Sequence, residues 1–126
     1  MMTAIEADCK RCTSYHQATL IDRLGIPPDE VEAVRDYETS PLVSEEERKV
    51  IRFARNVAFG GPVTVQDMRD LRQMGYTDTQ IVEIVSVATL EAGFARRGAA
   101  LSKFEDVFDW PAEHIPSEQY SKHLAD

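Results

Sequence analysis

The sequence has 126 residues, of which 43% are hydrophobic, and a formal net charge of −8. This length suits one compact domain, and nothing in the composition indicates a second. The acidic charge argues against a nucleic-acid backbone or an anionic membrane surface as the main partner, because both would repel the protein. No apolar run approaches the length that crosses a bilayer, and the first residues lack a secretory pattern, so we expect a cytoplasmic protein.

Residues 3–24 contain no proline or glycine, and their apolar side chains recur at three- and four-residue intervals. This pattern predicts one amphipathic helix. Thr3 followed by Glu6 has the form of a capping box, so the helix is expected to begin there and to end at Gly25. Cys9 then lies beyond the first turn, where the helix dipole has little effect.

Further helices are predicted from start signals along the chain. Pro28 opens a short helix that is expected to end near residue 40, while Ser44, Thr64 and Thr77 each resemble the N-cap of another helix. No strand alternation or internal repeat is present. The fold class predicted from the sequence is therefore all-α.

The helix that begins after Thr77 is expected to be central, because its apolar residues cover more than one face. Gly93 and Gly98 within it mark close helix packing, a kink or a break. We expect a helical domain over residues 1–108 and a polar tail over residues 109–126.

Cys9 and Cys12 are the only cysteines, and His16 follows them. On a helix, residues three apart have Cα atoms roughly 5 Å apart, so a disulfide can close, and His16 lies about 6 Å from Cys12 on the same face. A closely spaced pair in a reducing compartment is more often catalytic or metal-binding than structural. Two alternatives stay open: the cysteines are small core residues, or the three residues are ligands of Zn²⁺.

The Cys-x-x-Cys-x-x-x-His helix is followed by Leu-Gly-Ile-Pro-Pro-Asp-Glu-Val at 24–31. Two segments that contain predicted helices come next, at 42–54 and 63–84. In this order, the elements resemble the alkylhydroperoxidase D-like branch of the carboxymuconolactone decarboxylase family, over roughly residues 5–105. The resemblance implies an all-helical unit that assembles into trimers or hexamers. It also implies a thiol-dependent alkyl hydroperoxide reductase or disulfide oxidoreductase without a cofactor or a bound metal.

The resemblance assigns a role to each residue of the motif. Cys12 corresponds to the cysteine that attacks the peroxide, Cys9 to the resolving cysteine and His16 to the proton relay. The glutamate of the family relay would fall before the start of this sequence, so Glu6 and Glu91 are the candidates to replace it. A dithiol donor, such as a lipoyl or thioredoxin-like protein, is implied as the partner that restores the thiols.

Two other functions are consistent with the same motif. One is a carboxymuconolactone decarboxylase-like protein with another activity or no redox activity. The other is an oligomeric module that binds zinc through cysteine and histidine.

Overall fold

The computed structural model describes residues 1–101, which form helices and, within that range, no strands. The predicted all-α class is confirmed for this part of the chain. The predicted domain end at residue 108 and the predicted tail at 109–126 lie outside the described residues. The elements are α1 (Met2–Glu6), α2 (Lys10–Ala18), the π-helical turn η1 (Thr19–Arg23), α3 (Pro28–Ala33), α4 (Glu45–Phe59), α5 (Val65–Gln73) and α6 (Asp78–Leu101).

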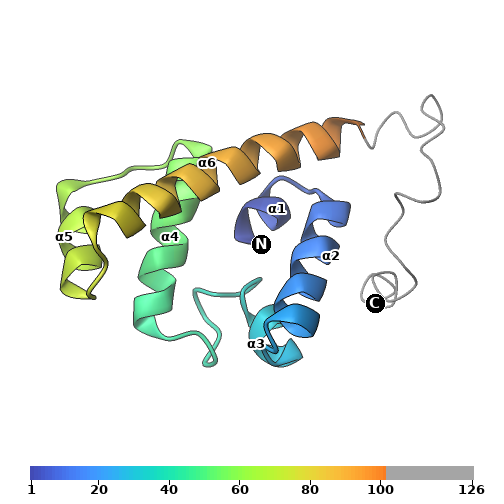
Figure 1. Cartoon of the computed structure of the whole chain (residues 1–126), viewed down its shortest axis with the longest axis horizontal. Coiled ribbons are helices and arrows are strands. Elements are labelled where there is room, and N and C mark those ends of the chain that lie inside the picture. Colours follow the sequence, from blue (N-terminus) through green and yellow to red (C-terminus); the bar gives the residue numbers. More distant parts are fainter. Residues whose placement is uncertain (102–126) are drawn as a thin grey trace.

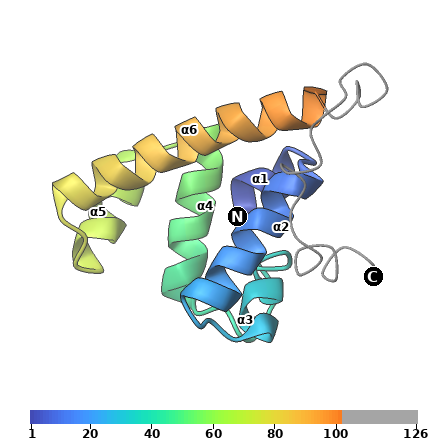
Figure 2. The ribbon, with the colours of Figure 1, turned by 45° about the vertical axis from the view of Figure 1, so that its right-hand side comes forward.

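The long helix α6 is the scaffold, as predicted, and it contacts α1, α2, α4 and α5. Figures 1 and 2 show α1 and the start of α2 beside its carboxyl-terminal part and α5 beside its amino-terminal part. None of the helices in the described part of the chain combines the length and apolar character that crossing a bilayer requires.

Small side chains dominate the contacts along the carboxyl-terminal part of α6. Ala95 packs with Ala4 of α1 in one buried cluster, and Ala88 and Ala92 pack with Ala58 of α4 in another. Because a methyl group fills little space, α1 and α4 lie close to the α6 backbone. A third cluster, built on larger side chains, joins α4, α5 and the first turns of α6.

The three later start signals are confirmed. Ser44 and Thr64 form capping boxes with the third residue of α4 and of α5, and Thr77 exchanges the corresponding hydrogen bonds with Gln80 at the start of α6. Each pair satisfies backbone N–H groups that a helix leaves without a partner. Helix α4 ends at Gly60, which adopts a left-handed conformation with φ of 73°.

The prediction of one helix over residues 3–24 is wrong. Helix α1 ends at Glu6, the chain turns at Asp8, whose φ of 53° lies in the left-handed region, and helix α2 begins after Cys9. Aspartate tolerates this conformation better than most residues other than glycine. The predicted Thr3 cap is also wrong, because Thr3 lies buried inside α1, whose N-cap is Met1.

Two other boundaries differ from the prediction. The helix that opens at Pro28 ends at Ala33, and turns rather than helix continue toward residue 40. Helix α6 runs without a break through both glycines. Gly98 is a close-packing position, whereas no atom lies within 4 Å of a Cβ placed at Gly93.

Candidate redox site

Cys9 and Cys12 form a disulfide at the amino terminus of α2, with their Cα atoms 5.3 Å apart. Cys9 is the N-cap residue, and its sulfur accepts a hydrogen bond from the backbone N–H of Cys12 at 3.4 Å. The expectation that Cys9 lies beyond the first helical turn is therefore wrong. Both sulfur atoms are at the positive end of the α2 dipole, a position that favours thiolates after reduction.

The two cysteines differ in their access to solvent. Cys9 is 4% exposed and packs with Ala4 and Ala95, whereas Cys12 is only partly buried. A molecule that arrives from solution therefore meets Cys12 more readily than Cys9.

Gly98 of α6 lies directly against the disulfide. A Cβ atom at this position would lie 2.9 Å from the sulfur of Cys9 and 3.3 Å from that of Cys12. Both distances are shorter than the usual contact between nonbonded atoms. Because Gly98 has no side chain, α6 can pack against the disulfide.

His16 of α2 forms a polar contact with Glu91 of α6. The Nε2 atom of His16 lies 2.6 Å from Oε1 of Glu91, and each side chain is 25% exposed. The contact joins the last turns of α2 to the middle of α6. When Nε2 donates its proton to the carboxylate, the neutral ring keeps Nδ1 as its basic nitrogen. The ring of Tyr15 packs edge-on against His16, with centroids 5.7 Å apart.

Glu6, the other candidate carboxylate, contacts a different partner. Its two oxygens accept hydrogen bonds from Nε and Nη2 of Arg55 in α4, at 2.8 and 3.3 Å. This interaction raises the pKa of the Arg55 guanidinium. The structure therefore brings Glu91, and not Glu6, to His16.

The α-amino group of Met1 is a further charged group near Glu91. Burial lowers the pKa of this amino group, and the charge of Glu91 opposes that shift. Sequence reasoning missed this neighbour, because the capping-box interpretation placed the helix start at Thr3 rather than at Met2.

Within residues 1–101, no group of three or more histidine, cysteine, aspartate or glutamate side chains is placed to hold a metal ion. Comparisons with known proteins add no relative, since no protein-family model, curated protein or solved structure matches the chain. The resemblance to the alkylhydroperoxidase D-like branch stays a prediction.

Proposed function

We propose that this protein is a thiol-dependent oxidoreductase that reduces an organic hydroperoxide, using Cys9 and Cys12 as its redox pair. The observation that supports the proposal best is one arrangement: a Cys-x-x-Cys disulfide at the amino terminus of α2, with His16 farther along the same helix and paired with Glu91 of α6. We also propose that the helices adopt the alkylhydroperoxidase D-like fold that the sequence resembles.

In the oxidative half of the cycle, the Cys12 thiolate attacks the terminal oxygen of the hydroperoxide. The O–O bond breaks, Cys12 becomes a sulfenic acid and the alcohol leaves with a proton. The Cys9 thiol then attacks the Cys12 sulfur, which forms the disulfide and releases water. His16 accepts the proton of the Cys12 thiol and supplies one to the leaving oxygen, while Glu91 orients the imidazole.

In the reductive half, a thiolate of an external dithiol attacks the sulfur of Cys12, because Cys9 is buried. Cys9 leaves as a thiolate, which the backbone N–H of Cys12 and the helix terminus stabilise. The second donor thiol then attacks the mixed disulfide and releases Cys12, and the donor ends as a disulfide. A lipoyl or thioredoxin-like protein has the required chemistry.

The test is a thiol count by mass spectrometry on reduced protein before and after treatment with an alkyl hydroperoxide. We expect two thiols to disappear per chain, one intramolecular disulfide to form and dihydrolipoamide to restore both thiols. Cys12→Ser should abolish peroxide consumption, whereas Cys9→Ser should leave a sulfenic acid that a dimedone reagent traps on Cys12. Two unmodified thiols after prolonged treatment would exclude the proposal.

We further propose that the chain is a homo-oligomer, a trimer or hexamer by the resemblance, working in the cytoplasm. Apolar side chains that α6 leaves exposed support this assembly, among them Val82 at 63%, Val87 at 64%, Leu90 at 61% and Phe94 at 48%. Exposed apolar side chains on one helix favour association. Light scattering that reports a monomer at micromolar concentration would contradict the assembly.

A further inference from the structure

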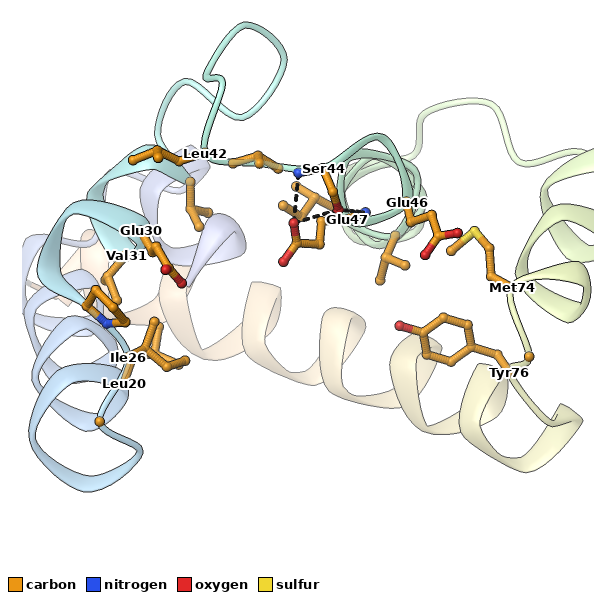
Figure 3. A pocket seen from close by; sticks show the side chains of 17 residues that line it. Leu20, Ile26, Glu30, Val31, Leu42, Ser44, Glu46, Glu47, Met74 and Tyr76 are labelled. Carbon is orange, nitrogen blue, oxygen red and sulfur yellow. Dashed lines mark hydrogen bonds between the residues drawn. The ribbon is translucent and has the colours of Figure 1, made fainter.

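A cavity of about 900 Å³ lies away from the disulfide, between the segment from η1 to α3 on one side and α4 and the α5–α6 turn on the other (Figure 3). Its lining contains none of the redox-site residues Cys9, Cys12, His16 and Glu91. An inference about this cavity is therefore independent of the proposed redox chemistry. Its volume falls in the range of about 300–1,000 Å³ that small-molecule sites occupy.

The walls of the cavity are largely apolar. Leu20, Ile26 and Val31 line one side, and Ile51 and Met74 line the other. Burial of a hydrocarbon group against such walls is favourable, because it removes apolar surface from water. The cavity is thus suited to the apolar body of a ligand.

Every charged side chain that lines the cavity is a carboxylate: Glu30, Glu46 and Glu47, with no lysine or arginine among the lining residues. Figure 3 shows the carboxylates of Glu30 and Glu47 and the hydroxyl of Tyr76 directed into the space. The lining therefore combines an apolar surface with a concentrated negative charge.

The carboxylates differ in their existing partners. Glu47 accepts hydrogen bonds from the backbone N–H and the hydroxyl of Ser44, and these bonds lower the pKa of its carboxyl group. Glu47 therefore stays ionised well below neutral pH. The side chains of Glu30 and Glu46 make no hydrogen bond or ion pair within residues 1–101, so their carboxylate oxygens are available to a ligand.

We propose that this cavity binds a small organic ammonium ion with an apolar body. The hydrocarbon part packs against the apolar walls, and the ammonium group donates hydrogen bonds to Glu30 and to the neighbouring carboxylates. The hydroxyl oxygen of Tyr76, which is directed into the space, can accept a further hydrogen bond from the ammonium group. A carboxylate ligand of the same size is repelled by the same lining.

The test compares three probes that share one apolar body: 2-phenylethylammonium, 2-phenylethanol and phenylacetate. Binding to the full chain is measured by calorimetry and by chemical-shift changes of backbone amides. We expect the ammonium ion to bind roughly fivefold more tightly than the alcohol, as a partly exposed ion pair allows, and phenylacetate to bind most weakly. Added salt should reduce the preference.

Variants assign the preference to the cavity. Glu30→Gln and Glu46→Gln should each reduce the difference between the ammonium ion and the alcohol, whereas Glu83→Gln, on the exposed side of α6 and outside the lining, should not. Circular dichroism confirms that each variant is folded. Equal affinity for the ammonium ion and the alcohol, no binding of any probe at millimolar concentration, or the same loss in the Glu83 variant would overturn the proposal.

Discussion

Substitution of Gly98 by alanine tests whether α6 constrains the disulfide. The added Cβ would lie 2.9 Å from the Cys9 sulfur, inside the contact distance of roughly 3.5–4 Å for nonbonded atoms. The helix or the disulfide must therefore move. Gly93→Ala is the matched control, because it lies on the same helix and its new methyl group has no neighbour within 4 Å.

The expected magnitude follows from two opposing effects. Alanine stabilises a helix interior by about 1 kcal/mol relative to glycine, and both variants gain this contribution. Overpacking costs about 1–3 kcal/mol, and only Gly98→Ala incurs this cost. The free energy of unfolding of the oxidised protein should therefore be about 1–3 kcal/mol lower for Gly98→Ala than for Gly93→Ala.

The same contact predicts a redox effect. Reduction frees the two sulfur atoms to rotate away from residue 98, so part of the overpacking cost is relieved in the reduced protein. If about 1.4 kcal/mol is relieved, the reduction potential of Gly98→Ala rises by about 30 mV. Urea unfolding of oxidised and reduced protein, and redox titration with trapping of free thiols, measure both quantities. Identical unfolding free energies and potentials for the two variants would refute this account of α6 packing.

Three further predictions concern other positions. Asp8→Val should lower the free energy of unfolding by about 1–2 kcal/mol in urea titration, because a β-branched residue disfavours the left-handed conformation, whereas Asp8→Gly should stay within about 1 kcal/mol of the native chain. Glu47 has a lowered pKa when folded, so its stabilising contribution is complete above the unfolded pKa of about 4.3 and is lost as the pH falls through the folded value. Because solvent screens this exposed carboxylate, Glu47→Gln should cost only about 0.5 kcal/mol at pH 7, and the cost should shrink progressively as a urea titration is repeated at pH values below about 4.3. Glu91→Gln should slow the reaction of Cys12 with peroxide roughly tenfold and alter the pH profile of its alkylation, whereas Glu6→Gln, which removes an ion pair with another partner, should do neither in stopped-flow assays.

The later helices were predictable because their signals are local. Ser44, Thr64 and Thr77 each have the polar partner three residues ahead that closes a cap, and Gly60 provides the left-handed residue that ends α4. These bonds form within one turn, so tertiary structure is not needed to specify them.

The start of the chain was not predictable in the same way. The apolar periodicity of residues 3–24 persists across the break, because α1 and α2 both bury side chains against α6. Asp8 tolerates a left-handed conformation but does not require one, so the sequence carried only a weak signal for the turn. Periodicity reports which side chains are buried, and not whether the backbone between them is continuous.

In the candidate site, too, the local features were predictable from the sequence and the long-range contact was not. The spacing of Cys9, Cys12 and His16 predicted that the cysteines could form a disulfide, and they do. Glu91 was one of two candidate carboxylates, and only the packing of α2 against α6 distinguishes it from Glu6. A contact between residues 75 positions apart has no local signature in one sequence.

The turn at Asp8 accounts for the asymmetry of the redox pair. In a continuous helix, both cysteines would lie on one face, and neither sulfur would accept a backbone hydrogen bond, because interior N–H groups are already paired. The turn instead makes Cys9 an N-cap, where its sulfur accepts a bond from the N–H of Cys12, while α6 covers it through Gly98. Cys12 stays accessible and shares its helix with His16. In the proposed reductive step, this asymmetry directs the incoming thiolate to the sulfur of Cys12 and makes Cys9 the leaving group.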